Sequence, residues 1–255
     1  MLFKRLDFNK FEKSYIINNK RLFNPYGNIS NDTLEKCFDF AYNMSFSNKG
    51  VHRNYRSGGT ISRKKGQIFS DTFQGKLAEC VTCEFFSKFD KNVKVDFSIS
   101  GYGIWDSVDL VVGNKNISVK STKAYSQLLL LETKDWDKEG LYIPNKKNAT
   151  DICAYDFFVL VRIKPYCEEI LKTKRLLYEN DQIESKKLKD LIFKEKWEYD
   201  FAGFITHSEF VEIINSKNYI IPKGAKLGKY TIMDAENYYV QVGNLHYIDE
   251  FYKFL

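Results

Sequence analysis

The stretch Ser107-Val-Asp-Leu-Val-Val-Gly-Asn-Lys-Asn-Ile-Ser-Val-Lys-Ser121 decides the fold of this chain. Apolar and polar side chains alternate on both sides of Gly113–Asn116, and this period of two predicts an antiparallel hairpin. With the loop centred between residues 114 and 115, residue 112 pairs with 117 and residue 109 with 120. Asp109 and Lys120 then share one face, with Cβ atoms about 4.5–5.5 Å apart. A carboxylate beside an ammonium on an otherwise apolar sheet indicates metal-assisted hydrolysis.

Two helices and a strand are expected before the hairpin. The first helix covers 32–46 and starts with Asp32 and Glu35 at the spacing of a capping box. The second covers 72–89, where apolar residues recur at helical spacing. Alternating apolar residues over 93–99 then predict a strand.

The segments after the hairpin predict the rest of an α/β domain. Residues 125–131 and 156–163 are strongly apolar, which favours strands at the centre of a sheet covered on both faces. A lysine-rich amphipathic helix with a solvated basic face is expected over 179–198. The remaining expected elements are a strand over 201–205, a helix over 206–214 capped by Thr206 and Glu209, and a small β-rich part over 220–227 and 238–242. No repeat or low-complexity linker interrupts this order, so a single domain is predicted.

Composition and length set broad limits on the protein. With 255 residues, of which 44% are hydrophobic and 28% charged, the chain can bury a substantial core. The formal charge of +6 is compatible with a polyanionic partner. No apolar run approaches the roughly 18 residues of a membrane span, and the N-terminus lacks a signal-peptide core. The expected location is therefore cytoplasmic, with no membrane association.

The five cysteines are odd in number and irregularly spaced, which argues against a secreted disulfide framework. Cys80 and Cys83 form a CxxC pair, but they lie within a predicted helix and no second pair follows at zinc spacing. They are therefore interpreted as small core residues rather than zinc ligands.

The order of helix, hairpin and paired charges resembles the PD-(D/E)xK nuclease superfamily, and type II restriction endonucleases in particular. The matching residues are Gly75-Lys-Leu-Ala-Glu79 on the helix, Asp109 on the first hairpin strand, and Ser118-Val-Lys120 on the second. More loosely, Gly203–His207 and Met233–Tyr239 look like C-terminal portions of such proteins. The resemblance implies an α/β (α+β) fold with a restriction-endonuclease-like mixed β-sheet core flanked by helices. It divides one endonuclease domain, 1–255, into an N-terminal DNA-recognition elaboration over 1–69, a catalytic core over 70–165 and a C-terminal helical and β-rich portion over 166–255.

The same resemblance implies Mg²⁺ as the cofactor and assigns roles to single residues. Asp109 is the first expected metal ligand, and the backbone carbonyl of Val119 is expected to face the metal. Lys120 is expected to orient or help deprotonate the attacking water and to balance charge in the transition state.

The motif departs from the family pattern at Ser118, where Asp or Glu is usual. A serine hydroxyl is a poor metal ligand beside a carboxylate, so a second carboxylate must come from elsewhere. Glu79 on the helix is the favoured candidate, and Glu132, after the apolar run 128–131, is the alternative. Asp106 is a weaker third option.

A basic segment before the second helix is the candidate DNA contact. It contains Arg53, Arg56, Arg63, Lys64 and Lys65 around two glycines, and Lys123 is assigned to the same DNA-binding set. Arginines can grip phosphates or read guanine edges, and glycines allow close backbone approach. A solvated basic loop is an equal alternative for this segment.

The expected function is Mg²⁺-dependent, sequence-specific cleavage of double-stranded DNA by a type II restriction enzyme of a restriction–modification system. A homodimer is expected, because one such site cuts one strand and a palindromic duplex offers two symmetric targets. DNA repair or junction-resolving nucleases share the same core and stay open. So do a non-catalytic nucleic-acid-binding protein and a structural α/β protein.

Overall fold

The computed structural model describes residues 3–46, 63–98, 108–147 and 154–254, which fold into a mixed α+β structure with three β-sheets. The helices are α1 (Asn31–Phe46), α2 (Lys65–Phe86), α3 (Ile143–Lys147), α4 (Cys167–Thr173), α5 (Ser185–Phe193) and α6 (His207–Ser216), with the 3-10 turns η1 (Thr133–Asp135), η2 (Val242–Asn244) and η3 (Ile248–Phe254). The strands are β1 (Asp7–Asn9), β2 (Ser14–Ile16), β3 (Gly27–Asn28), β4 (Leu110–Val112), β5 (Lys115–Lys123), β6 (Leu128–Glu132), β7 (Phe157–Lys164), β8 (Glu198–Thr206), β9 (Ile220–Ile221), β10 (Lys226–Leu227), β11 (Thr231–Ile232) and β12 (Asn237–Gln241).

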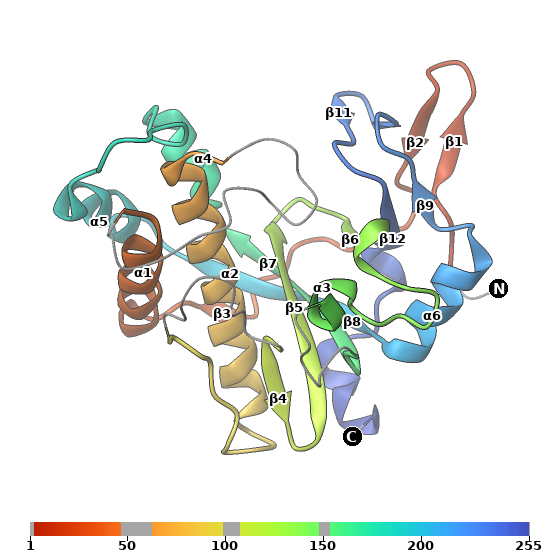
Figure 1. Cartoon of the computed structure of the whole chain (residues 1–255), viewed down its shortest axis with the longest axis horizontal. Helices are drawn as coiled ribbons and strands as arrows, with labels where there is room; N and C mark the ends of the chain where they lie inside the picture. The colour runs from red at the N-terminus through yellow and green to blue at the C-terminus, as the bar shows by residue number, and fades with distance from the viewer. Residues whose placement is uncertain (1–2, 47–62, 99–107, 148–153, 255) are drawn as a thin grey trace.

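The central sheet has the strand order β3-β8-β7-β5-β4, with β5 and β7 parallel and the other neighbours antiparallel. Helix α2 covers one face of this sheet and α1 packs against α2, while the small sheet β6-β12-β9 with α6 covers the other face (Figure 1). A third sheet, β1-β2-β10-β11, lies beyond the small sheet on the side away from α2 (Figure 1). The predicted α+β class is confirmed.

Strand β7 lies at the centre of the fold, as its apolar run predicts. Every residue from Phe157 to Ile163 is buried. Val159 packs into the core under α2, whereas Phe158 and Leu160 pack into the core under the small sheet. Alternate side chains of β7 therefore pack into two separate cores, which explains why the sequence shows no polar alternation in this strand.

The predicted hairpin is present, but its register differs by two residues. Leu110 pairs with Ile117 and Val112 with Lys115, so the turn contains only Gly113 and the residue after it. Gly113 adopts a positive φ of 60°, which suits the first central position of a two-residue hairpin turn. Residue 109 consequently lies opposite residue 118, not opposite 120 as predicted. A shift of two residues keeps every side chain on its face, so Asp109 and Lys120 remain on the same side.

Helix α2 begins at Lys65, earlier than the predicted residue 72, and the predicted helix end at 89 is also wrong because α2 ends at Phe86. At this earlier start, the Lys64 N–H donates to the Gln67 Oε1 at 3.0 Å, and Gly66 packs so tightly that a Cβ there would lie 2.2 Å from the carbonyl oxygen of Leu176. Buried Phe69 extends the apolar stripe into this first part of the helix.

Three other local predictions need correction. The described part of the segment 93–99 forms no strand, because Val93 packs into the core without a neighbouring strand to pair with. In segment 125–131, only the residues from Leu128 onward form a strand, β6, which lies at the edge of the small sheet with Leu130 exposed rather than covered on both faces. The helix expected over 179–198 is only α5.

The helix termini show which local predictions hold. Helix α1 is capped by Ser30, whose Oγ accepts a hydrogen bond from the Thr33 N–H at 3.1 Å, rather than by Asp32. Helix α6 has the predicted capping box, in which Thr206 and Glu209 exchange hydrogen bonds with each other's backbone. Within the described ranges, no helix is long and apolar enough to span a membrane.

Candidate active site

Asp109 lies where the β4–β5 ladder ends. The last pair joins Leu110 and Ile117, and the chain bends away from β5 at Asp109. The Asp109 Oδ2 accepts a hydrogen bond from the Val119 N–H at 2.7 Å and another from the Ser118 Oγ at 3.3 Å. The carboxylate therefore takes the place that a β4 residue would occupy if the ladder continued.

The carbonyl of Val119 points to the same edge of β5. Within a strand, the N–H and C=O of one residue point to one side, and successive residues alternate. The Asn116 carbonyl accepts a hydrogen bond from the Asp156 N–H on the β7 side, so Val119 points to the opposite side, where Asp109 lies. No pair of the described β4 reaches Val119, so the Asp109 carboxylate and the Val119 carbonyl lie at a stretch of the β5 edge that β4 leaves unpaired.

Lys120 is the next residue of β5. It pairs with Leu160 of β7, and its half-buried side chain lies on the sheet face that the small sheet covers. Among the described residues, its ammonium has no hydrogen-bond or ion-pair partner. A cation on the same sheet face as Asp109 is therefore available to an anionic ligand.

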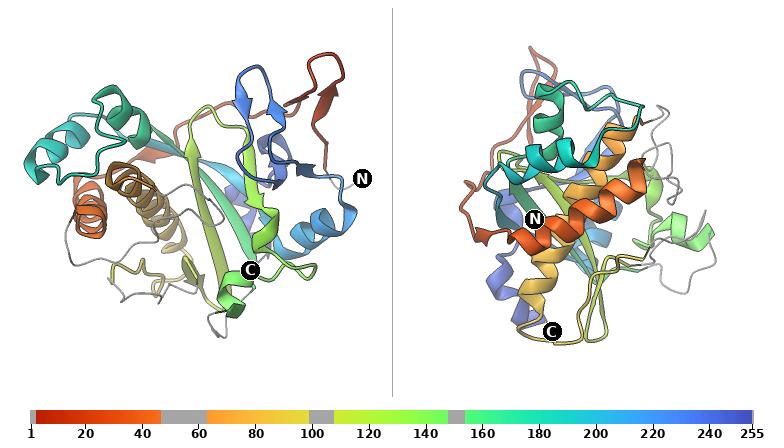
Figure 2. Two further views of the ribbon diagram at one scale, coloured as in Figure 1. Left: turned by 45° about the horizontal axis from the view of Figure 1, so that its top comes forward. Right: turned by 90° about the vertical axis from the view of Figure 1, so that its left-hand side faces the viewer.

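Glu132 ends β6 in the layer that covers this face. β6 returns beside β5 after the arch, which we define as residues 124–127 (Figure 2). Leu130 of β6 and Thr122 of β5 line the same cavity. Because side chains alternate along a strand, Glu132 lies on the same face of β6 as exposed Leu130, whereas Leu129 and Leu131 lie on the opposite face and are buried.

The carboxylate of Glu132 is partly shielded from solvent. Its Oε2 is buried and accepts no hydrogen bond within the described structure, although the Lys134 Nζ lies 3.2 Å away. Burial raises the pKa of this carboxyl, and Lys134 opposes that shift. The Lys134 ammonium therefore already supplies a positive charge to this buried oxygen.

Glu79 lies on the other side of the sheet. It is on α2, which covers the face to which Ile117 and Val119 point. Its Oε2 lies 2.6 Å from the Nζ of Lys76, and both side chains are largely buried. In the described ranges, no hydrogen bond or ion pair joins Asp109 to Glu79 or to Glu132, and no group of three His, Cys, Asp or Glu side chains could hold a metal ion.

The predicted DNA-binding residues are only partly described. Arg53 and Arg56, like the metal candidate Asp106, lie outside the described residues. Arg63 pairs with Asp71 at 3.1 Å. Lys64 is exposed just before α2, and Lys65 is the first residue of that helix.

Lys123 belongs to a separate cluster at the end of β5. Its Nζ lies 3.4 Å from Glu169 and 4.0 Å from Glu168, and 5.2 Å above the ring of Tyr166. Burial opposes its charged form, but Glu168 and its other partners outweigh burial and raise the pKa of Lys123.

The structure also assembles residues that the sequence did not bring together. Lys20, Tyr125 and Gln127 line two cavities, one on each side of the arch. Lys164 lines the second of them. These residues come from three distant segments without a shared motif, so no local pattern could have predicted their convergence.

Comparisons with family models, with curated proteins and with solved structures give no match to this chain. The nuclease resemblance therefore depends on the hairpin residues and their geometry alone.

Proposed function

We propose that this protein is a Mg²⁺-dependent endonuclease that hydrolyses phosphodiester bonds of double-stranded DNA, of the type II restriction class, and that it acts as a homodimer. One observation carries the proposal. The Asp109 carboxylate and the Val119 carbonyl lie at a stretch of the β5 edge that β4 leaves unpaired, and Lys120 follows on the same strand without a partner in the described structure.

The oxygens at this edge suit a magnesium ion. Mg²⁺ prefers oxygen ligands and is commonly held by one or two carboxylates with water and substrate phosphate. Asp109 has one oxygen engaged by the Val119 N–H, which leaves the other available as a ligand. When bound, Mg²⁺ supplies Lewis-acid activation of water and neutralisation of phosphate charge.

We propose Glu132 as the second carboxylate in preference to Glu79. Glu132 lies in the layer facing Lys120, whereas Glu79 lies on the helix behind the sheet. The Oε2 of Glu132 lies 3.2 Å from the Nζ of Lys134, a longer ion pair than the 2.6 Å between the Oε2 of Glu79 and the Nζ of Lys76. Ser118 completes the arrangement by donating to Asp109, so it orients the ligand without being one.

The protein side chains then have separate tasks. The backbone N–H of Val119 and the hydroxyl of Ser118 hold the Asp109 carboxylate in one orientation. The Lys120 ammonium neutralises charge that develops on the phosphate and positions the attacking water. Lys64 and Lys65, at the start of α2, are proposed to contact the DNA backbone.

The test uses two variants that preserve shape. Asp109→Asn can still accept the Val119 N–H but loses the charge, and Lys120→Met keeps the length of the side chain. Each protein is incubated with a mixed-sequence plasmid and Mg²⁺, and the ends are mapped. We expect discrete cleavage by the wild type, loss of cleavage in both variants, and retained duplex binding.

Asp181→Asn, at an exposed residue outside the site, is the matched control and should cleave as the wild type does. Wild-type cleavage by both site variants would exclude this mechanism. Duplex binding without any metal-dependent cleavage by the wild type would instead favour a non-catalytic nucleic-acid-binding protein.

A further inference from the structure

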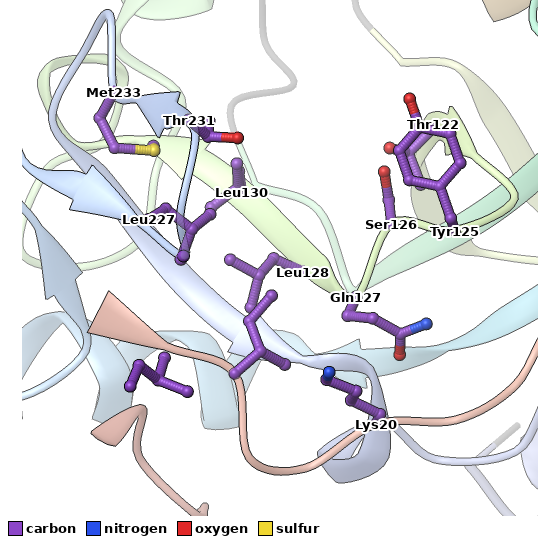
Figure 3. Close-up of a pocket in the computed structure, with 13 residues that line it drawn as sticks. Lys20, Thr122, Tyr125, Ser126, Gln127, Leu128, Leu130, Leu227, Thr231 and Met233 are labelled. Atoms are coloured by element: carbon purple, nitrogen blue, oxygen red, sulfur yellow. The ribbon is translucent and has the colours of Figure 1, made fainter. Parts of the chain in front are cut away.

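Two cavities flank the arch between β5 and β6, and they differ in chemistry. The apolar cavity has a volume of about 420 Å³ and lies between the arch, β6 and the β10–β11 hairpin (Figure 3). Its walls are mainly Leu128, Leu130, Leu227 and Met233, with the hydroxyl of Thr122 at the β5 end. Both its volume and its apolar walls with few polar groups are typical of small-molecule sites, which span about 300–1,000 Å³.

The lysine cavity lies on the other side of the arch and has a volume of about 710 Å³. Three lysines line it: Lys20, Lys123 and Lys164. Glu168 and Glu169 offset the charge of Lys123. Within the described structure, the ammonium groups of Lys20 and Lys164 have neither a hydrogen bond nor an ion pair. Glu198 on β8 lies opposite Lys164 and interacts with it electrostatically, and Glu169 also lines the cavity.

The two cavities share a wall of three residues, Lys20, Tyr125 and Gln127. The Tyr125 hydroxyl donates to the Glu169 Oε1 at 2.8 Å, which holds the ring in place. The Gln127 Oε1 accepts the Arg21 N–H at 3.0 Å, which leaves the amide NH₂ of Gln127 as a donor for a ligand. The Tyr125 ring, the Gln127 amide and the Lys20 ammonium therefore lie at the boundary between the apolar cavity and the lysine cavity.

We propose that the two cavities form one binding site for a nucleoside monophosphate unit, with the base in the apolar cavity and the phosphate at Lys20 and Lys164. The base is flat and mostly apolar, with hydrogen-bonding edges that the Gln127 amide can donate to. The Tyr125 ring supplies a stacking surface. The dianionic or monoanionic phosphate matches the two ammonium groups that lack a direct partner in the described structure.

The site lies next to the candidate active site. Thr122 lines the apolar cavity and lies two residues beyond Lys120 on the same face of β5, a separation of roughly 6.6 Å along a strand. This is short enough for the bound unit to be a nucleotide of the DNA strand near the cleaved bond, and that source rests on the proposed nuclease function. The other source is a free nucleotide, which needs no nuclease activity.

Binding is tested first without DNA or Mg²⁺. Calorimetry with deoxynucleoside monophosphates, the matching nucleosides and inorganic phosphate should show that the monophosphate binds more tightly than either part. Lys20→Glu and Lys164→Glu should each weaken monophosphate binding about ten- to a hundredfold, because each loses a charge-assisted contact. Leu130→Trp should fill the apolar cavity and weaken nucleoside and monophosphate binding while phosphate binding persists.

Lys186→Glu on α5 and Val111→Trp on β4 are the matched controls, since both residues are exposed and lie outside the two cavities. Circular dichroism is the check that each variant is folded.

The DNA arm uses duplexes that carry 2-aminopurine at successive positions. A fluorescence rise on binding, lost in Leu130→Trp but not in Val111→Trp, would identify a nucleotide extruded from the strand. Saturable binding of the free monophosphate without such a rise would identify a free nucleotide as the ligand. Either result supports the site.

The proposed nucleotide site would be overturned if neither monophosphate binding nor the 2-aminopurine fluorescence rise were seen. Equal behaviour of the cavity variants and their controls would overturn it as well. Asp109→Asn separates this proposal from the nuclease function, because it should abolish cleavage and leave nucleotide binding intact. If the wild type cleaves no DNA but monophosphate binding is lost in Lys20→Glu, the nucleotide site stands and the nuclease function fails.

Discussion

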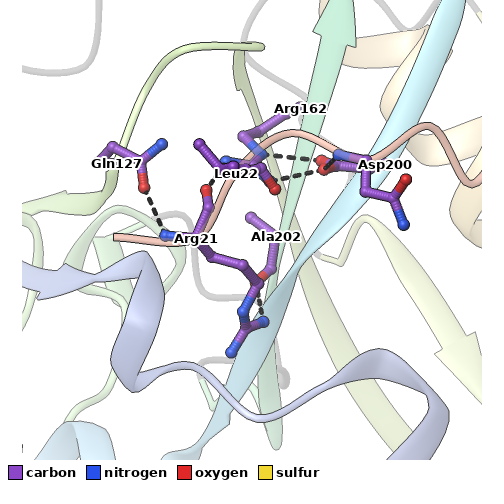
Figure 4. Close-up of polar contacts among 7 residues, drawn as sticks. Arg21, Leu22, Gln127, Arg162, Asp200 and Ala202 are labelled. Carbon is purple, nitrogen blue, oxygen red and sulfur yellow. Dashed lines mark hydrogen bonds and ion pairs between the residues drawn. The ribbon is translucent and has the colours of Figure 1, made fainter. Parts of the chain in front are cut away.

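Arg162 on β7 and Lys120 on β5 are cations on the same face of neighbouring strands, in opposite circumstances. Arg162 is fully buried and directly opposite Asp200 on β8, with Nε–Oδ1 and Nη2–Oδ2 distances of 2.9 and 2.6 Å (Figure 4). Its remaining donors reach the carbonyls of Arg21 and Leu22 at 2.8 and 2.9 Å. Lys120 is half-buried and has no partner in the described structure.

The difference separates a structural charge from a functional one. A buried cation whose three nitrogens are all hydrogen-bonded offers little to a ligand, and Arg162 instead joins the segment of Arg21 and Leu22 to the sheet. A cation beside an open strand edge keeps its charge for an incoming anion. The cross-strand pair of carboxylate and cation that the sequence predicted at 109 and 120 is found instead at 162 and 200.

The largest effect that this comparison predicts is on stability. Arg162→Met leaves Asp200 as an uncompensated buried charge, so we expect a loss of about 3–5 kcal/mol in the free energy of unfolding. Urea denaturation followed by circular dichroism measures it. Arg162→Met combined with Asp200→Leu should recover part of the loss. A stable single variant would mean that Arg162 is not the structural partner described above.

The second prediction concerns Lys120. Lys120→Met should lower the cleavage rate about 10²–10⁴-fold, the usual contribution of a positioned proton-transfer or charge-balancing group. Because no partner is lost, the urea midpoint should stay at the wild-type value. A clear fall in that midpoint would show that Lys120 is structural, like Arg162.

The third prediction compares the two glutamates. Glu79→Gln removes the charge paired with Lys76 and should reduce stability by about 1–3 kcal/mol. Glu132→Gln removes a carboxylate whose pKa is raised by burial, so stability in the absence of metal should not fall. Cleavage with Mg²⁺ should be lost in Glu132→Gln and retained in Glu79→Gln. The reverse pattern of activity would return Glu79 to the site.

The smallest predicted effect is at Ser118. Its Oγ lies 3.3 Å from the Asp109 Oδ2, a long hydrogen bond, and the Val119 N–H holds the same carboxylate at 2.7 Å. Ser118→Ala should therefore cost less than about 1 kcal/mol in stability and preserve most of the cleavage rate. Thermal denaturation and plasmid digestion measure the two quantities. A complete loss of cleavage would make Ser118 part of the reactive machinery.

Elements governed by local rules could be predicted from the sequence. Strand β7 follows from its apolar run, and α6 follows from the capping box of Thr206 and Glu209. The hairpin was also correctly placed. Its register was not, because whether the turn has two or four residues depends on the backbone geometry at Gly113, which alternation alone does not report.

Long-range packing explains the predictions that failed. The alternation over 93–99 has no strand partner in the described part, and the start of α2 depends on the fit of Gly66 against Leu176. A strand or helix end that depends on a distant segment carries no local signature.

The sequence by itself determined that Asp109, Ser118 and Lys120 share one face of a hairpin, because side-chain period and strand alternation are local properties of the backbone. Only the tertiary structure decided which layer covers that face. It placed Glu132 there and Glu79 behind the sheet, and it brought Lys20, Gln127 and Lys164 together around the arch. These placements arise from the packing of two cores on opposite faces of one sheet, and packing partners far apart in the chain leave no spacing to detect.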